Sequence, residues 1–232
     1  MILNPESIHL FKGDFVTDFS AIKNKLRNIK AFIFDWDGVF NNGQKNNAGH
    51  SSFNEVDSMG INLMRFNSFL FQQKLPITAI ITGEKNELAL SFAKRENFNA
   101  VYFKAKNKET ALLHFCQTYH LTPAEVMFVY DDILDFSVAK LVGVRMMVQH
   151  TANPLTQDYA KRNRLVDYIT YYDGNNNALR EISELVMLLS NNFQKVVEMR
   201  IKYSPEYVKY IATKNDTPTL SFMADGENIV QI

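Results

Sequence analysis

The sequence predicts an α/β fold, in which a mainly parallel, doubly wound sheet of the Rossmann-like kind carries helices on both faces. Short apolar runs rich in β-branched and aromatic residues alternate with segments of helical periodicity along most of the 232-residue chain. This alternation is typical of parallel strands joined by helical crossovers. Several apolar runs also end in carboxylates or hydroxyls, first at Asp35 and Asp37. Open α/β sheets bind their ligands at the carboxyl ends of such strands.

The first part of the chain predicts one strand between two helices. Residues 31–34 form an uninterrupted apolar run, as expected for a strand that is buried on both faces. Asn-Gly pairs follow and favour tight turns, so a β-hairpin flap is predicted next. The predicted elements are a lead-in over 1–20, a helix over 20–28, a strand over 31–35, the flap over 38–56 and a helix over 58–73.

The rest of the core repeats the order of strand followed by helix. The predicted strands cover 76–81, 100–103, 125–130, 144–148 and 168–171. The predicted helices cover 85–96, 107–119, 133–142, 155–163 and 177–202, the last as one long helix. Because strands and helices alternate throughout, both faces of the sheet should be covered.

A single domain is predicted over residues 1–203, with its core at about 28–190, and a C-terminal arm or tail over 204–232. The arm contains Pro205 and Pro218 and shows no clear periodicity, which favours an extended segment. Whether it docks on a neighbouring subunit or is disordered stays open at this point.

Composition limits the class of partner. The chain has 25 basic and 25 acidic residues and a formal net charge of zero, whereas binding to nucleic acid or anionic membranes normally requires a basic excess. Cys116 is the one cysteine, which excludes an intramolecular disulfide and fits a reducing compartment. The sequence shows no signal peptide or membrane span. We therefore expect a cytoplasmic protein with no nucleic-acid or membrane partner.

Seven polar side chains lie at or shortly after the ends of predicted strands, namely Asp35, Asp37, Thr82, Lys108, Asp131, Asp132 and Asp135. Each alone has an ordinary explanation. An aspartate pair is common in solvated turns, a threonine or aspartate often caps a helix, and a lysine usually lies on the surface. Because the carboxyl ends of parallel strands meet at one edge of the sheet, the set together predicts a site for phosphoryl transfer.

The residue types fit that chemistry. A carboxylate nucleophile, here Asp35, can form an aspartyl-phosphate and divide hydrolysis into two easier steps. Asp37 can protonate the leaving oxygen and then deprotonate the attacking water. Mg²⁺ prefers oxygen ligands, so Asp35 and Asp131, with a backbone carbonyl near Asp37, are the predicted metal ligands.

The remaining candidates would hold the phosphate. Thr82 and the backbone amides at Gly38 and Gly83 can donate to phosphate oxygens. Lys108 can neutralise the charge that builds up during transfer. Flap residue His50 is interpreted as a solvated loop histidine.

These motifs resemble those of the haloacid dehalogenase-like phosphohydrolase superfamily. The matching residues are Asp35-Trp-Asp37-Gly38, Thr82-Gly83, Lys108 and Asp131-Asp132-x-x-Asp135. The stretches between these motifs are too short for a cap domain, and the Asp57-Ser-Met-Gly60-Ile61 segment is similar to the capless branch. That branch includes phosphatases of 3-deoxy-D-manno-octulosonate 8-phosphate and of sialic-acid-type 9-phosphates. The resemblance implies a homotetramer, in which flaps and tails of neighbouring subunits close each site.

The chain differs from the capless branch at positions that contact the substrate in that branch. Glu84 stands where the branch has an arginine, and Tyr130 stands where it has a glycine, while Arg180 is retained. Glu84 and Arg180 are therefore predicted substrate-binding residues alongside Gly38 and Gly83. The sequence predicts a Mg²⁺-dependent phosphomonoesterase that acts on a small sugar phosphate. The alternatives are a catalytically impaired oligomerisation module and, less well supported, a phosphotransferase or mutase.

Overall fold

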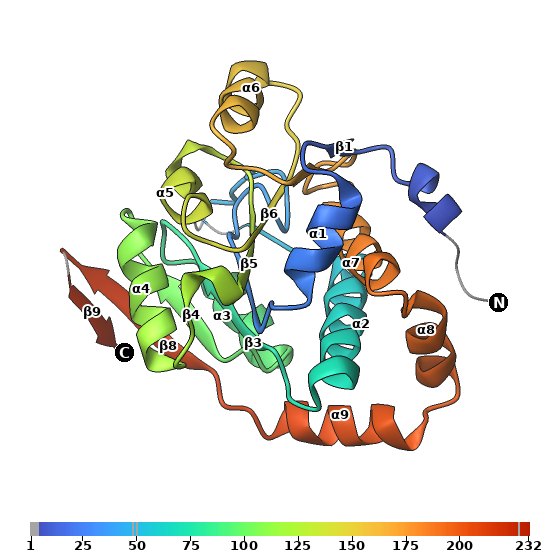
Figure 1. The fold of residues 1–232 in the computed structure, drawn as a ribbon. Coiled ribbons are helices and arrows are strands. Elements are labelled where there is room, and N and C mark those ends of the chain that lie inside the picture. The colour runs from blue at the N-terminus through green and yellow to red at the C-terminus, as the bar shows by residue number, and fades with distance from the viewer. Residues whose placement is uncertain (1–4, 48, 50, 227) are drawn as a thin grey trace.

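The described residues, 5–47, 49, 51–226 and 228–232 of a computed structural model, form one nine-stranded sheet with helices on both faces (Figure 1). The strand order is β1-β7-β6-β5-β2-β3-β4-β8-β9. Pairing is parallel from β7 through to β8, and antiparallel only where β1 meets β7 and β8 meets β9 at the two edges. The predicted α/β class and the mainly parallel sheet are confirmed.

The strands are β1 (Asp14–Phe15), β2 (Ala31–Phe34), β3 (Ile77–Ile81), β4 (Ala100–Phe103), β5 (Val126–Tyr130), β6 (Val144–Met147), β7 (Tyr168–Ile169), β8 (Leu220–Asp225) and β9 (Asn228–Gln231). The α-helices are α1 (Phe19–Leu26), α2 (Glu55–Gln72), α3 (Glu87–Arg95), α4 (Lys108–Thr118), α5 (Phe136–Ala139), α6 (Pro154–Arg162), α7 (Ala178–Leu189), α8 (Phe193–Ile201) and α9 (Pro205–Asn215). Short 3₁₀ turns cover Pro5–Leu10, Pro123–Glu125 and Ile133–Asp135. Among the described residues, none of these helices is both long and apolar enough to cross a membrane.

Strand β2 shows why the sheet lies at the centre of the molecule. Its four side chains are all buried and alternate between the two faces, as a period of two requires. Phe32 and Phe34 pack into the core under α1, α2, α3 and α7, whereas Ala31 and Ile33 pack into the core under α4, α5 and α6. A strand buried on both faces therefore appears in the sequence as a continuous apolar run.

The flap lacks the predicted β-hairpin. The described residues between Phe34 and Asn54 form turns and bends and no strand, and residues 48 and 50, including His50, lie outside the described part. Asn41 accounts for much of this geometry, since its Oδ1 accepts hydrogen bonds from the backbone N–H groups of Gly38 and Gly43, at 3.3 and 2.8 Å. Asparagine side chains compete in this way with ladder hydrogen bonds and stabilise turns instead.

The single helix predicted over 177–202 is two helices, α7 and α8. Asn191 between them has a φ of +56°, in the left-handed region that ends a helix and that asparagine tolerates. The Ser190 hydroxyl also donates to the Val186 carbonyl, at 2.7 Å. The break lets α8 turn away and lie beside α2 (Figure 1).

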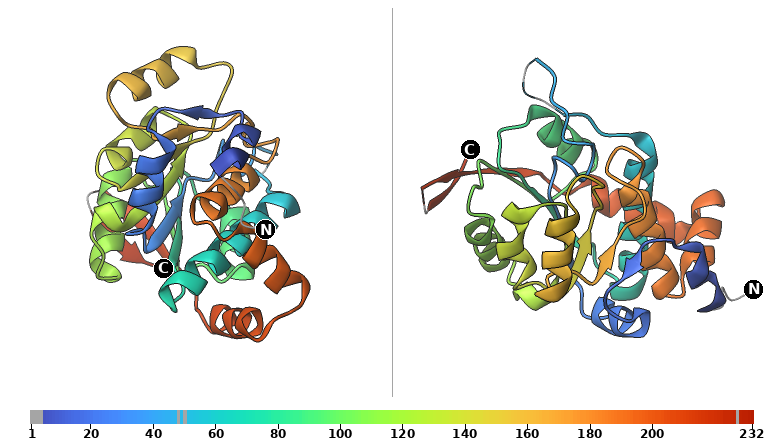
Figure 2. Two further views of the ribbon diagram at one scale, coloured as in Figure 1. Left: turned by 45° about the vertical axis from the view of Figure 1, so that its right-hand side comes forward. Right: turned by 90° about the horizontal axis from the view of Figure 1, so that it is seen from above.

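The segment 204–232 is not the predicted extended arm, since it contains α9, β8 and β9 and packs on its own chain. Ser204 caps α9, and Tyr207 and Tyr210 place their rings 5.0 and 5.2 Å from the ring of Phe66. Strand β8 then pairs in parallel with β4, and the Phe222 ring stacks on Tyr102 at 4.9 Å. The β8–β9 hairpin extends the sheet at the edge opposite β1 (Figure 2).

Candidate active site

The predicted catalytic residues meet at one edge of the sheet. Asp35 follows β2, Asp131 follows β5 and Thr82 follows β3, and these three strands are neighbours. Lys108 begins α4, and its Nζ lies 2.7 Å from Asp35 Oδ1 and 2.6 Å from Asp135 Oδ1. Parallel neighbours with the same polarity thus bring groups far apart in sequence into one buried cluster, as predicted.

Three of the carboxylates could share a cation. Asp35, Asp131 and Asp135 are all buried, and each offers an oxygen within 4.8 Å of the others. The predicted ligand set contained Asp35, Asp131 and a backbone carbonyl near Asp37, and did not contain Asp135. The side chain of Asp37 lies outside this group among the described residues and contacts the flap. The signal for Asp135 is its place in the Asp131-Asp132-x-x-Asp135 motif, four residues after Asp131.

The electrostatics of this cluster favour a bound cation. Burial raises the pKa of Asp35 well above its usual range, and the neighbouring charges of Asp135 and Asp131 raise it further against the opposing effect of Lys108. Burial likewise raises the pKa of Asp135. Burial lowers the pKa of Lys108, but the charges of Asp35 and Asp135 outweigh burial and the net shift is upward. Oxygen ligands with excess negative charge fit a hard divalent cation such as Mg²⁺.

Gly38 is required by its close approach to this cluster. Its φ is +87°, and a Cβ at this position would lie 2.0 Å from Asp131 Oδ2. Any other residue would therefore be strained and would also displace the Asp131 carboxylate. Gly83 differs, since a Cβ there would meet no atom within 4 Å. The space beside Gly83 is open, as a phosphate-binding position requires.

His150 is a site residue that sequence reasoning did not identify. Its Nε2 lies 2.9 Å from Asp131 Oδ2, and this hydrogen bond is the main cause of an upward shift in the His150 pKa. The available signal was positional, because His150 follows β6, the neighbour of β5, at the same edge of the sheet.

Comparisons with known proteins agree with this geometry. No family model matches the sequence. Over 171 residues the chain is 29% identical to the 3-deoxy-D-manno-octulosonate 8-phosphate phosphatase KdsC of Salmonella typhi, covering 72% of this chain and 84% of the relative. The corresponding Escherichia coli K12 protein is 29% identical over 168 residues, 71% of this chain and 82% of the relative.

Two solved structures share the fold. A putative HAD superfamily (subfamily III A) hydrolase from Legionella pneumophila superposes with a TM-score of 0.65 at 25% identity, over 78% of this chain and 94% of that chain. The Moraxella catarrhalis 3-deoxy-D-manno-octulosonate 8-phosphate phosphatase, solved with magnesium, phosphate and KDO, gives 0.63 at 26% identity, over 77% and 97%. The chain is thus similar in sequence and in fold to proteins of the haloacid dehalogenase-like superfamily.

Tyr130, a departure from the haloacid dehalogenase-like pattern, does not obstruct the acids. Its ring is fully buried in the core under α4, α5 and α6 and stacks on Phe128 at 5.5 Å. Its hydroxyl donates to the Leu165 carbonyl at 2.7 Å. Successive side chains of a strand point to opposite faces, so the Tyr130 ring lies on one face of the sheet and does not cover the Asp131 carboxylate at the end of β5.

The two charged residues that are predicted to bind substrate, Glu84 and Arg180, lie in different surroundings. Glu84 is exposed directly after Thr82 and Gly83, and its backbone N–H lies 3.4 Å from Thr82 Oγ1. Arg180, on α7, has its Nε 2.7 Å from Glu184 Oε1, so its guanidinium pairs with its own helix. Substrate binding by either residue stays a prediction.

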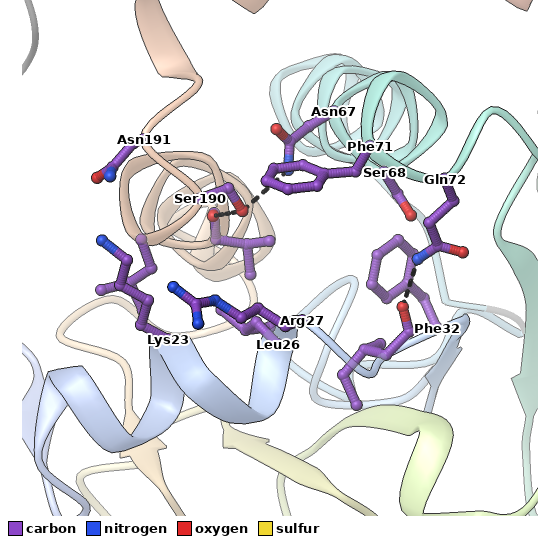
Figure 3. A pocket seen from close by; sticks show the side chains of 13 residues that line it. Lys23, Leu26, Arg27, Phe32, Asn67, Ser68, Phe71, Gln72, Ser190 and Asn191 are labelled. Atoms are coloured by element: carbon purple, nitrogen blue, oxygen red, sulfur yellow. Dashed lines mark hydrogen bonds between the residues drawn. The ribbon is translucent and has the colours of Figure 1, made fainter.

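Two cavities of similar size lie at opposite ends of this haloacid dehalogenase-like fold. One, of about 300 Å³, lies between α1 and the C-terminal ends of α2 and α7, and its lining contains Lys23, Arg27 and Asn67 but no carboxylate (Figure 3). The other, of about 290 Å³, lies beside the flap and is lined by Asn41, Asn42, Gln44, Lys45, Asn46, Ser52, Leu88 and Asn175. Lys45 links the second cavity to Asp37, because its Nζ lies 2.9 Å from Asp37 Oδ2.

Proposed function

We propose that this protein is a Mg²⁺-dependent phosphomonoesterase that hydrolyses a small sugar phosphate through an aspartyl-phosphate on Asp35. The observation that carries the proposal is the buried group of three carboxylates, two of them in contact with Lys108, at the carboxyl ends of adjacent strands. Buried carboxylates in excess of their cations are costly unless a ligand or metal compensates them.

Two proton transfers at Asp37 accompany two displacements at phosphorus. An oxygen of Asp35 attacks phosphorus, the bond from phosphorus to the sugar oxygen breaks, and that oxygen takes a proton from Asp37. Asp37 then removes a proton from water, the water oxygen attacks phosphorus, and the bond to Asp35 breaks to release phosphate. Lys108 contacts Asp35 at 2.7 Å and can neutralise charge on the transferring group.

The metal would be held by Asp35 and Asp131, with Asp135 and a backbone carbonyl near Asp37 as further candidates. When bound, it supplies positive charge that keeps Asp35 ionised and lets an anionic phosphate approach. Thr82 and the backbone amides of Gly38 and Gly83 would hold phosphate oxygens.

The cavity beside the flap supports a sugar as the leaving group. Five of its lining residues are asparagine or glutamine, whose amides can both donate to and accept from hydroxyl groups. Lys45 offers a cation to a sugar acid, whereas exposed Glu84 disfavours one. The relatives are named for 3-deoxy-D-manno-octulosonate 8-phosphate, so an eight- or nine-carbon sugar-acid phosphate is the first candidate substrate. A homotetramer in the cytoplasm completes the proposal.

The test is phosphate release from a panel of sugar phosphates with Mg²⁺, comparing the wild type with Asp35→Asn. The panel contains eight- and nine-carbon sugar-acid phosphates and neutral hexose phosphates, and Asp216→Asn at an exposed position is the control. We expect turnover that Asp35→Asn abolishes and Asp216→Asn retains. Glu84, in place of the arginine of the branch, favours one alternative, a module that only assembles the oligomer. That alternative would be supported if the wild type hydrolysed no substrate while light scattering showed an intact oligomer.

A further inference from the structure

We infer that Ser51, in the flap, is a positioning residue that orients the carboxylate of Asp37 for its two proton transfers. The inference rests on the proposed function, because it assigns Asp37 the acid and base roles. Ser51 is 1% exposed, and its hydroxyl contacts three groups from two other segments of the chain. Trp36 Nε1 lies 3.0 Å from Ser51 Oγ, Asn86 Nδ2 also lies 3.0 Å from it, and Ser51 Oγ contacts Asp37 Oδ1.

The direction of the Ser51 proton follows from its partners. An indole N–H can only donate, and a serine oxygen has two acceptor positions and one proton. If the amide nitrogen of Asn86 faces Ser51, both acceptor positions are filled by N–H groups. The hydroxyl proton is then left for Asp37, whose carboxylate oxygen accepts it.

The orientation of the Asn86 amide is fixed independently. Asn86 is fully buried, and its Oδ1 caps α3 by accepting from the backbone N–H groups of Leu88 and Ala89, at 3.0 and 3.4 Å. The oxygen therefore faces the helix and the nitrogen faces Ser51. The cap of α3, which follows the Thr82–Gly83 loop, thus determines how the flap serine donates.

The flap also holds the second oxygen of Asp37. Lys45 Nζ lies 2.9 Å from Asp37 Oδ2, with its side chain about one third exposed. The carboxylate is therefore held on one side by a buried hydroxyl and on the other by a cation open to solvent. Since proton transfer depends steeply on the alignment of donor and acceptor, loss of the buried contact should slow both transfers.

The experiment compares Ser51→Ala with the wild type on two substrates with Mg²⁺. One is the best sugar phosphate from the panel, whose alkoxide leaving group needs a proton. The other is p-nitrophenyl phosphate, whose phenolate leaves without one. We expect kcat/KM for the sugar phosphate to fall by about 10- to 100-fold, and kcat/KM for the aryl phosphate to fall by less than about threefold. Equal losses on both substrates, or no loss on the sugar phosphate, would overturn the inference.

A second variant tests the proton direction without removing the serine. Asn86→Asp keeps an oxygen to cap α3 but replaces the N–H donor to Ser51 with an acceptor, which competes with Asp37 for the hydroxyl proton. We expect it to show the same selective loss on the sugar phosphate. Ser183→Ala is the matched control, since Ser183 is a buried serine of α7 whose hydroxyl has no partner in the described structure.

Fluorescence of Trp36, the one tryptophan of the chain, gives a readout that does not depend on activity. Its indole N–H bonds to Ser51, so Ser51→Ala should shift its emission while Ser183→Ala leaves it unchanged. If the wild type has no phosphatase activity, the proposed function fails. If the wild type is active and the Ser51→Ala emission is unchanged, the contact assigned here is absent.

Discussion

Two buried lysines of this chain lie in opposite electrostatic surroundings. Lys108 and Lys214 are 2% and 6% exposed, and burial lowers the pKa of both. At Lys108, the carboxylates of Asp35 and Asp135 at 2.7 and 2.6 Å outweigh burial and raise the pKa. At Lys214, the one carboxylate lies 3.4 Å away and burial prevails, so the pKa is lowered.

The clusters around the two lysines differ in how they are compensated. Lys108 contacts Asp35 and Asp135, two of a group of three buried carboxylates that Asp131 completes. Around Lys214, Glu96 also bonds Arg95 at 3.1 Å, and fully buried Arg65 donates to the backbone carbonyls of Glu96 and Asn97. The second cluster thus finds its partners within the protein and joins α2, α3 and α9. The first gathers three carboxylates that could hold a metal ion, which is the difference between a structural cluster and a candidate site.

Replacement of each lysine by methionine should separate the two roles most strongly. Lys108→Met removes the positive group beside the nucleophile, and we expect turnover to fall by about 10²- to 10³-fold. Lys214→Met should change kcat by less than about twofold, because no catalytic group contacts it. Steady-state phosphate release measures both. Equal activities of the two variants would contradict the assignment of Lys108.

Asp57 extends the comparison to a buried carboxylate that no cation neutralises at close range. It accepts from the Arg180 backbone N–H and from Asn54, yet burial raises its pKa to about 6. The cost of its charge is absent below about pH 4 and complete above about pH 6, so the native state loses stability as pH rises through this range. The shift corresponds to about 3 kcal/mol.

Asp57→Asn removes this pH dependence. The difference in free energy of unfolding between the variant and the wild type should therefore move in favour of the variant, by about 3 kcal/mol between pH 4 and pH 6.5. Urea denaturation at several pH values measures it. A constant offset from the altered hydrogen bond to Asn54 does not affect the slope, and a difference that stays flat with pH would refute the prediction.

Divalent cations should stabilise the protein by binding to the carboxylate cluster at Asp35, Asp131 and Asp135, and should not bind to the cluster around Lys214. At a Mg²⁺ concentration of 100 times the dissociation constant, binding adds about 2.7 kcal/mol to the stability of the wild type. Asp131→Asn should lose most of this gain, because it removes one of the three clustered carboxylates. Thermal unfolding with and without Mg²⁺ tests both statements. Stabilisation of Asp131→Asn equal to that of the wild type would place the cation elsewhere.

The sequence was most informative where local pattern and position coincide. Strand β2 and Asp35 were predictable because a strand buried on both faces is apolar throughout and ends where ligands bind. Strand β8 was not, because its burial depends on pairing with β4, more than a hundred positions earlier. The roles of His150 and Ser51 likewise depend on contacts with Asp131 and Asp37 that only the folded chain creates. No local periodicity records such contacts.

The smallest expected effect is on stability at Lys214. Lys214→Met removes a cation that burial disfavours and supplies apolar volume of similar length among the rings of α2 and α9. Glu96 keeps Arg95 and the Ser58 hydroxyl, which donates to it at 3.0 Å, so no carboxylate is left unpaired. We therefore expect the free energy of unfolding to change by less than about 1 kcal/mol. Glu96→Gln is the informative counterpart, because it leaves Lys214 and Arg65 facing each other without a carboxylate, and urea denaturation should show the larger loss there. A larger loss for Lys214→Met would mean that this cluster, too, depends on a particular cation.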